Sequence, residues 1–309
     1  MENEIIKKGF EIMDEAEELV LKNRVDEGLN NLAINFQKLL ETSDEQSWAD
    51  FTEKEFLKHS LVNLIHQDPF TRHSFVKPRN YAGDADLIDY MYGFRKPPNE
   101  TTELGNKIFE WTWKQSTAQS VRARRKIIAK MIDEMAVNSD GLRVLSIACG
   151  HLREAKISEA VLSGKIKEFF AFDQDEISLD KVKNELSRFN VKPIHSSIKK
   201  LFTNRHDFKD LDFVYAAGLY DYLPQKVAAK LTQRMFEMLK SGGRLLVANF
   251  APHLPDRGFG ETFAAWKLIY RNEAEVADFA SLIAHETICS QRLFWDEPKN
   301  VIYLEVIKK

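Results

Sequence analysis

The chain of 309 residues has little cysteine: Cys149 and Cys289 are its two thiols. Two cysteines are too few for a disulfide framework or a thiolate zinc site, and such scarcity is typical of a reducing compartment. Long hydrophobic runs are also missing. No segment approaches the roughly 18 apolar residues of a membrane-spanning helix, and residues 1–14 alternate charged and apolar side chains. The sequence therefore predicts a soluble, cytoplasmic protein without a membrane partner.

An excess of basic charge is absent as well. Lys and Arg number 44 and Asp and Glu number 47, which gives a formal net charge of -3. Proteins that bind along a phosphate backbone need a basic surface, so nucleic acid is a poor candidate partner. Hydrophobic residues make up 44% and charged residues 29%, which excludes a disordered or fibrous chain. The net charge and the composition do not indicate an oligomeric state.

The first part of the chain has helical periodicity. Apolar residues recur every three or four positions from Val25 to Leu40, which predicts an amphipathic helix. Thr52 and Glu55 have the spacing of a capping box, so a second helix is predicted to begin near Thr52. The dipeptide Asp68-Pro69 should end it.

A third, longer helix is predicted over residues 102–135, because no proline or glycine interrupts this segment after Gly105. Its later turns carry Arg122, Arg124, Arg125 and Lys126. Together these segments predict an N-terminal all-helical domain over residues 1–115.

From about Gly141 the pattern changes to short apolar runs separated by helical stretches, which is typical of parallel strands covered on both faces. Only five residues join the last two runs, so these must pair as an antiparallel hairpin. The predicted fold class for residues 116–309 is α/β, a seven-stranded, doubly wound, mostly parallel sheet that ends in an antiparallel hairpin. The predicted strands are Arg143–Ala148, Glu168–Asp173, Lys192–Ser196, Asp212–Ala217, Arg244–Phe250, Thr287–Trp295 and Val301–Ile307, with helices at Leu152–Ser163, Glu176–Arg188 and Gln225–Leu239.

Two strand ends suggest a cofactor site. Gly150 lies in the loop after the first strand, where a small residue lets backbone N–H groups approach a ligand. Asp173 ends the second strand 23 residues after Gly150, close to the roughly 20-residue spacing of a carboxylate that binds ribose hydroxyls. The alternative is a structural turn followed by a strand-end cap. An acid at this position disfavours NADP and leaves NAD and other adenosine cofactors open.

The strand order and the stretch Leu239-Lys240-Ser241-Gly242-Gly243-Arg244-Leu245 resemble class I S-adenosylmethionine-dependent methyltransferases over about residues 115–309. The resemblance implies S-adenosyl-L-methionine as the cofactor. This sequence departs from the family at Ser146, where an acid is usual, and at Ala148 and Leu152, which replace the outer glycines of the cofactor loop. Glu154 or Arg122 is expected to compensate at the methionine end. The cofactor residues implied are Tyr81, Arg122, Ala148, Gly150, Glu154, Asp173, Gln174, Ser197 and Gly218.

A narrower resemblance involves residues 77–84, Glu261 and residues 266–271. These segments are similar to a bacterial methyltransferase group that includes the extracellular-factor enzymes, which make 3-hydroxypalmitic acid methyl ester. In residues 77–84 a rigid proline and a flexible glycine frame Arg79, Tyr81 and Asp84, which are expected to fold over the cofactor as a lid that excludes water. An ordinary proline-glycine turn is the alternative.

The substrate side is expected to include Arg79, Asn249, Trp266, Tyr270 and Arg271. Trp266 and Tyr270 lie four residues apart on a predicted helix, which places both rings on one face beside Arg271, whose guanidinium suits a carboxylate. The alternative is that the aromatics are core residues and that Arg271 forms surface ion pairs.

His253 and Tyr220 are the candidate general bases, with structural roles as the alternative. The predicted function is methylation of a small molecule, as an O-methyltransferase acting on an acidic or acyl substrate between the two domains. Two alternatives stay open: N- or O-methylation of another small natural product, and an inactive S-adenosylmethionine-binding interaction protein. The sequence shows no pattern of metal ligands, so no metal is expected.

Overall fold

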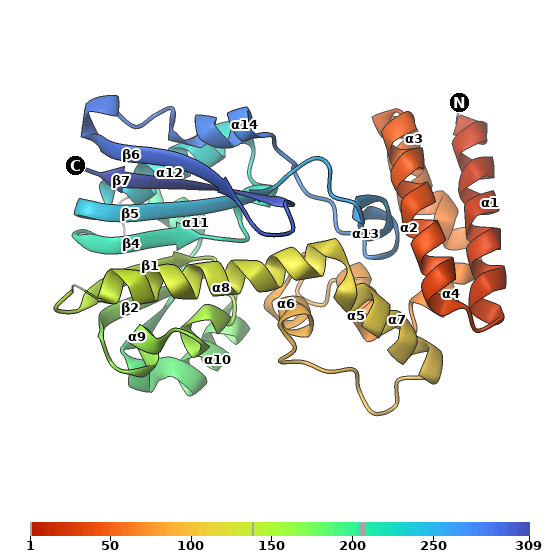
Figure 1. Ribbon diagram of the computed structural model, residues 1–309, viewed down its shortest axis with the longest axis horizontal. Helices are drawn as coiled ribbons and strands as arrows, with labels where there is room; N and C mark the ends of the chain where they lie inside the picture. Colours follow the sequence, from red (N-terminus) through yellow and green to blue (C-terminus); the bar gives the residue numbers. More distant parts are fainter. Residues whose placement is uncertain (1, 138, 204–207) are drawn as a thin grey trace. The chain divides into compact units, whose positions relative to one another are not determined.

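The computed structural model describes residues 2–137, 139–203 and 208–309 (Figure 1). The chain divides into two compact units. The first holds the residues up to Val121 together with His253–Lys267, and the second holds Arg122–Pro252 and Leu268–Lys309. The predicted domains did not anticipate that His253–Lys267, which follows the fifth strand, belongs with the helices.

Side chains cap the starts of four helices of the helical unit, α3, α5, α6 and α7. Asp68 accepts hydrogen bonds from the N–H groups of Phe70 and Thr71 at the start of α5, where Pro69 occupies the first helical position. Asp84 caps α6 in the same way through Leu87 N–H. The helices are α1 (Glu2–Leu21), α2 (Val25–Thr42), α3 (Glu45–Asp50), α4 (Leu61–Ile65), α5 (Pro69–Val76), α6 (Ala85–Tyr92), α7 (Glu103–Lys114), the first residues of α8 (Ser116–Ala136) and α13 (Arg257–Phe263).

The amphipathic helix from Val25 is confirmed as α2, but two other helix predictions were wrong. Thr52 caps no helix, because its hydroxyl donates backward to Ala49 O within a π-helical turn, and Asp44 caps the preceding α3 instead. The long helix is interrupted at Gln115, which is extended at ψ 159°. The Gln115 amide donates to Trp111 O and thereby caps the end of α7.

The segment His253–Lys267 completes the core of the helical unit. Phe263 stacks on Phe36 of α2 with ring centroids 5.8 Å apart, and the indole N–H of Trp48 donates to the buried Glu261 carboxylate at 2.7 Å. A Cβ at Gly258 would lie 2.7 Å from the Phe36 carbonyl carbon, so only glycine allows this approach. The helical unit therefore depends on residues far along the chain.

The second unit contains the predicted seven-stranded sheet in the order β3-β2-β1-β4-β5-β7-β6. Neighbouring strands are parallel except that β7 pairs antiparallel with both β5 and β6, so the doubly wound sheet and its terminal hairpin are confirmed. The strands are β1 (Leu142–Ile147), β2 (Ile166–Asp173), β3 (Val191–His195), β4 (Leu211–Ala216), β5 (Leu239–Phe250), β6 (Ile288–Trp295) and β7 (Val301–Lys308).

The fifth strand begins at Leu239 and not at the predicted Arg244, so the pair Gly242-Gly243 lies in a bulge inside β5. The pairing with β4 shifts register between Leu239 and Arg244, and Gly242 has a φ of 74°. A Cβ at Gly243 would lie 2.8 Å from Leu211 O, so glycine is required there.

Helices cover both faces of the sheet, with α8 on one face and α11 and α12 on the other (Figure 1). The core on the second face includes fully buried side chains of β1, β4, β5 and β7 packed against α12. The helices that follow α8 along the chain are α9 (Glu159–Leu162), α10 (Glu176–Leu186), α11 (Ile198–Leu201), α12 (Gln225–Glu237) and α14 (Glu273–Ala277).

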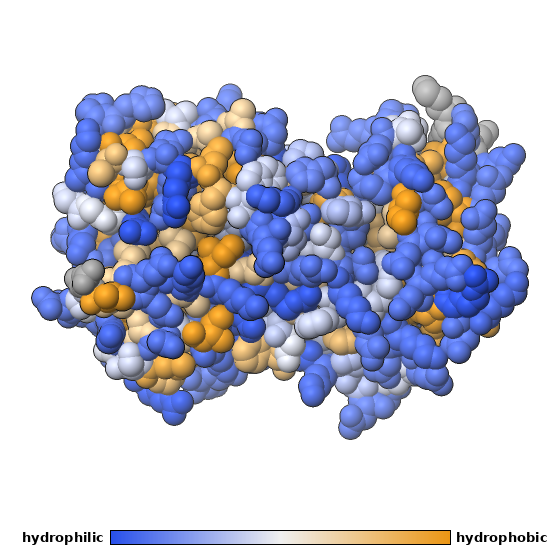
Figure 2. Space-filling view, viewed as in Figure 1, coloured by the Kyte–Doolittle hydropathy of each residue, from blue (hydrophilic) through white to orange (hydrophobic). Residues whose placement is uncertain are grey.

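Hydrophilic side chains dominate the face drawn in Figure 2, and apolar residues gather in separate groups between them. Within the described ranges, we find no helix with the length and apolar character that crossing a membrane requires.

Candidate functional site

The sheet order places a topological switch between β1 and β4, because the chain runs outward from β1 to β2 and β3 and then returns to β4. In open α/β sheets ligands bind beyond the carboxyl ends of the strands at this point. Gly150 and Gly218 lie in the loops that follow β1 and β4, and Asp173 is the last residue of β2, so the structure brings these predicted residues to one edge of the sheet.

The loop after β1 has an alternating left-handed backbone. Ala148, Gly150 and Leu152 have φ values of 53°, 53° and 49°. These are the three positions at which the resemblance expects glycine, and glycine is present at one of them, Gly150. A left-handed conformation costs a residue with a Cβ about 1–2 kcal/mol, and the side chain of Leu152 is 1% exposed and anchors the turn.

Asp173 is bound to this loop. Its Oδ2 accepts the Gly150 N–H at 2.8 Å, its Oδ1 accepts the Asp175 N–H at 2.9 Å, and the residue is 8% exposed. Burial raises the pKa of Asp173 above its usual value, against these backbone hydrogen bonds, which lower it. A carboxylate oxygen can accept two hydrogen bonds, so one per oxygen leaves capacity for two hydroxyl groups. This geometry suits a vicinal diol such as a ribose.

The end of β3 contributes the remaining predicted residues of this edge. Ser196 N–H donates to Asp173 O at 2.8 Å, and Ser197 follows as the N-cap of α11. His195 Nε2 lies 3.1 Å from Gln174 O, which holds the exposed Gln174 beside the same strand end. The structure thus brings Gln174 and Ser197 to the edge that carries Gly150 and Asp173.

Glu154 is buried beside β4. Its Oε1 accepts the hydroxyl of Tyr215 on β4 at 2.5 Å, and the residue is 7% exposed. Burial raises the pKa of the Glu154 carboxyl, while Tyr215 and the charge of Arg124 act in the opposite direction. Arg122, the other candidate for the methionine end, lies partly buried on α8.

The sequence interpretation gave no role to Arg124, a residue of α8 whose guanidinium reaches the end of β4. Its Nη1 donates to Ala217 O at 2.7 Å, and a Cβ at Gly218 would lie 3.1 Å from Nη1 and 3.5 Å from Nη2. Arg124 therefore covers the glycine predicted to lie beside the methyl end of the cofactor. The run of arginines on the predicted helix was the available signal, but periodicity alone did not indicate which of them reaches the sheet edge.

Tyr220 lies in the core. It is 0% exposed, and its hydroxyl lies 2.8 Å from Thr232 Oγ1 on α12. Burial raises the pKa of Tyr220 well above its usual value. These contacts do not support the predicted role as a general base, which requires an accessible and readily ionised group.

The predicted substrate residues Asn249 and Arg271 meet in a buried network after β4 and β5. Arg271 is 3% exposed and donates to Tyr220 O at 2.9 Å, to Asn249 Oδ1 at 2.7 Å and to Leu223 O at 2.5 Å. Asp221 joins the network by accepting the Phe250 N–H at 2.7 Å. The guanidinium therefore fixes the loop that follows β4, and this geometry does not present it to a substrate carboxylate.

The helix predicted for residues 266–271 was wrong. Residues 264–272 form no helix, since α13 ends at Phe263 and α14 begins at Glu273, so the four-residue spacing does not place Trp266 and Tyr270 on one helical face. Trp266 belongs to the helical unit and Tyr270 to the sheet unit. Tyr270, Arg271 and Ile269 line an open surface depression of about 460 Å³ with Pro224, Gln225, Asn272, Ala274, Glu275 and Asp278.

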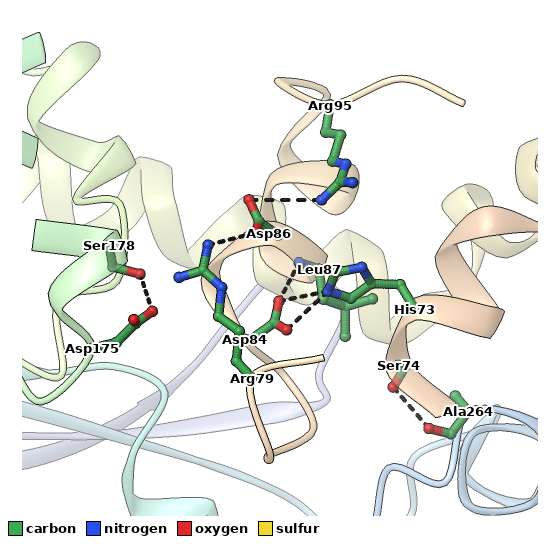
Figure 3. A network of polar contacts seen from close by, with 10 residues as sticks. All are labelled: His73, Ser74, Arg79, Asp84, Asp86, Leu87, Arg95, Asp175, Ser178 and Ala264. Atoms are coloured by element: carbon green, nitrogen blue, oxygen red, sulfur yellow. Dashed lines mark hydrogen bonds and ion pairs between the residues drawn. The ribbon is translucent and has the colours of Figure 1, made fainter. Parts of the chain in front are cut away.

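The predicted lid residues lie in a polar network of the helical unit (Figure 3). Arg79 pairs with Asp86 at 2.5 Å, and His73 Nε2 lies 2.9 Å from both carboxylate oxygens of Asp84. Tyr81 is 37% exposed in the turn between α5 and α6. The lid and the cofactor role of Tyr81 stay predictions, as does the role of His253, an exposed residue of the helical unit.

In the helical unit, Asp14, Glu17 and His59 lie close enough together to hold a metal ion. His59 Nδ1 accepts the Leu61 N–H at 3.1 Å, so the neutral ring carries its proton on Nε2. That nitrogen lies 3.0 Å from Asp14 Oδ1 and donates to it. The hydrogen bond between His59 and Asp14 therefore explains why these side chains lie together, with Glu17 as a neighbouring acid.

No family model matches the chain, and a search of curated proteins finds no match. Among solved structures, "a possible exported protein" from Bordetella parapertussis has a TM-score of 0.62 at 14% identity, with 92% of this chain and 95% of that chain covered. At this identity the likeness shows a shared fold.

Two further similar structures are named as methyltransferases. The magnesium protoporphyrin IX methyltransferase of Synechocystis PCC 6803 with bound S-adenosyl-L-homocysteine has a TM-score of 0.48 at 13% identity, covering 80% of this chain and 100% of that one. The N-methyltransferase NodS of Bradyrhizobium japonicum WM9 in complex with the same compound has a TM-score of 0.42 at 13% identity, covering 60% and 87%.

Proposed function

We propose that the chain is an S-adenosylmethionine-dependent methyltransferase that acts on a small molecule. The observation that carries the proposal is Asp173, a mostly buried carboxylate that accepts the Gly150 N–H at 2.8 Å, beside the topological switch of a sheet with a terminal antiparallel hairpin. An acid held in this way binds a ribose diol.

The described residues fit the cofactor. Asp173 would accept the ribose hydroxyls, Ser197 and Gln174 would lie on its adenine side, and the left-handed loop at Gly150 lets backbone approach the ligand closely. When bound, S-adenosylmethionine supplies a methyl group on a positively charged sulfur. The protein then needs to hold the acceptor in line with that methyl group and to exclude water, and it needs no nucleophile of its own.

For the acceptor we propose an acidic or acyl compound that is methylated on oxygen. A carboxylate is nucleophilic without deprotonation, whereas an alcohol, phenol or ammonium acceptor needs a base. Tyr220 is buried and bound to Thr232, which favours an acceptor that needs no base from this position. Arg271 no longer supports this acceptor class, because its donors are bound to protein oxygens.

Binding of S-adenosylhomocysteine to Asp173 variants tests the proposal. Asp173→Ala removes a charged acceptor for two hydroxyl groups and should weaken binding roughly 10- to 100-fold in calorimetry, from about 1.5–3 kcal/mol for hydrogen bonds to a charged group. Asp180→Asn removes an equal charge from an exposed position of α10 and should leave the affinity unchanged.

Turnover is then measured as transfer of labelled methyl from S-adenosylmethionine to a panel of carboxylic acids, amines and phenols. Unchanged affinity in a folded Asp173→Ala protein would remove Asp173 from the site. Tight binding of NAD by the parent protein, without binding of S-adenosylhomocysteine, would refute the methyltransferase assignment. Transfer to amines or phenols alone would refute the acid acceptor.

A further inference from the structure

The two edge strands of the sheet, β3 and β6, differ in how they resist pairing with another strand (Figure 1). Edge strands present unpaired N–H and C=O groups, and proteins protect such edges with short length, proline or lysine. β3 has all three protections, because it is five residues long and carries Lys192 and Pro193. β6 has eight residues, with neither lysine nor proline. β6 is therefore the edge with less protection against another strand.

The outer side of β6 is open. Among the residues that the structure describes, no backbone hydrogen bond joins residues 289–294 to a segment other than β7. Residues 289–292 are exposed and residues 293–295 are half-buried. Leu293 and Trp295 pack against the core that faces α12, which holds the strand in place. The edge is therefore both fixed and accessible.

The charged residue of β6, Arg292, is paired within its own sheet. Its Nε donates to the carboxylate of Glu305 on β7, which is 3% exposed. The guanidinium also lies over the ring of Phe294, 5.1 Å from the ring centroid. The pairing with Glu305 offsets the charge of Arg292, so this arginine repels another strand less than an unpaired lysine would.

We propose that two copies of the chain associate through β6, which pairs antiparallel with β6 of the second copy and extends the sheet. A two-fold rotation makes a strand edge complementary to itself, because it brings N–H groups opposite C=O groups. The occupant is therefore argued from the edge itself, and the inference does not depend on the proposed function.

Charge selects the register of this pairing. Directly opposed residues share a face of the sheet, so the axis passes beside one residue and its own copy. The pairing of β6 with β7 is regular from Ser290 to Trp295, and the centre of this stretch lies between Arg292 and Leu293. An axis at Arg292 would oppose two arginines. An axis at Leu293 opposes two leucines and places each Arg292 opposite a Phe294, so we place the axis at Leu293.

Sedimentation equilibrium of the full-length chain tests the association. The mass of the wild type should rise from the 35.8 kDa of one chain towards twice that value as the protein concentration increases. A reductant is present throughout, because Cys289 is exposed. Hydrogen exchange over the same concentrations locates the contact: the amides of residues 291–295 should exchange more slowly in the dimer, and those of β3 should not change.

Charge variants at Leu293 test the position of the axis. Leu293→Lys and Leu293→Glu each oppose like charges and should dimerise more weakly than Leu293→Gln, which removes the same apolar contact without adding a charge. An equal mixture of the lysine and glutamate variants opposes unlike charges and should associate roughly 2- to 30-fold more tightly than either variant alone. Asn184→Lys is the matched control, because it changes an exposed amide on α10, and it should leave association unchanged. Circular dichroism shows whether each variant is folded.

The outcomes decide the proposal without reference to the cofactor. A concentration-dependent dimer with slower exchange in residues 291–295, and tighter association in the mixture, supports it. A wild-type chain that stays at 35.8 kDa at every concentration overturns it, even if β6 binds a strand of another protein. A dimer without slower exchange in residues 291–295, or a mixture no tighter than its components, also overturns it. Binding of S-adenosylhomocysteine to Asp173 variants tests the proposed function separately.

Discussion

Asp221 should make the stability of the sheet unit depend on pH. The residue is 4% exposed, and its Oδ1 accepts the Phe250 N–H at 2.7 Å. Burial raises the pKa of Asp221 from 3.8 to about 6, although the Phe250 hydrogen bond and the charges of Arg124 and Arg271 oppose the rise. The folded protein therefore holds the proton of this carboxyl more tightly than the unfolded chain does.

The sign and size of the effect follow from linkage. Because the pKa of the folded state lies above that of the unfolded state, the stabilising contribution of the protonated group is fully present below pH 3.8 and is lost as the pH rises through about 6. A difference of roughly two pKa units corresponds to about 3 kcal/mol. Asp221→Asn keeps an oxygen for the Phe250 N–H and has no proton to lose, so its stability should lack this decline.

Urea unfolding followed by circular dichroism at several pH values between 4 and 7.5 measures the effect. The free energy of unfolding of Asp221→Asn minus that of wild type should rise by about 2–3 kcal/mol across this range, most steeply between pH 4 and 6. All other titrating groups are common to both proteins and largely cancel. A difference that stays constant with pH would show that the two arginines compensate the burial of Asp221 fully.

Two further predictions concern backbone strain and the helical core. Ala148→Gly should stabilise the protein by about 1 kcal/mol in thermal unfolding, because glycine relieves the strain of a φ of 53°. Gly150→Ala should destabilise the protein by a similar amount, and melting temperatures equal to that of the wild type would contradict the predicted strain. Trp48→Phe should lower the free energy of unfolding in urea by about 1.5–3 kcal/mol, because it leaves the buried Glu261 carboxylate without the indole donor. Trp113→Phe is the control: it loses a hydrogen bond to the neutral Met91 O and should lower the free energy of unfolding by less.

The sheet could be predicted from the sequence because its strands are buried on both faces. Such strands produce continuous apolar runs, and the five residues between Trp295 and Val301 are too few for a parallel connection. The order of the pairs then follows from the family that the sequence resembles, and all seven strands are observed.

Helix ends and the position of His253–Lys267 could not be predicted in the same way. Gln115 ends α7 through a hydrogen bond of its own side chain to Trp111 O, and Thr52 donates backward to Ala49 O, so neither residue follows its usual positional preference. Phe259 and Phe263 are apolar residues without a local pattern that indicates a distant partner. Their contacts with Phe36 and Trp111 depend on the folded helical unit.

The same division applies to the site. The proximity of Gly150 and Asp173 could be predicted because the chain places both at neighbouring strand ends, a consequence of topology that holds before any side chain packs. Arg271 could not be judged, because whether an arginine faces a ligand or the core depends on the loop that carries it. Here residues 264–272 form no helix, and the loop turns the guanidinium toward carbonyl groups of the β4 loop.

The loop after β1 shows why a missing glycine motif is an incomplete guide to backbone conformation. Positive φ recurs at alternating positions of this loop, and glycine adopts that conformation at the lowest cost. Ala148 and Leu152 adopt it because tertiary contacts hold the loop: Cys149 N–H donates to Phe172 O at 3.2 Å, and Leu152 N–H donates to Cys149 O at 3.0 Å. A sequence that replaces two of three glycines can therefore keep the conformation at a cost of a few kcal/mol. Gly150 keeps the expected residue type, and its N–H donates to Asp173 at 2.8 Å.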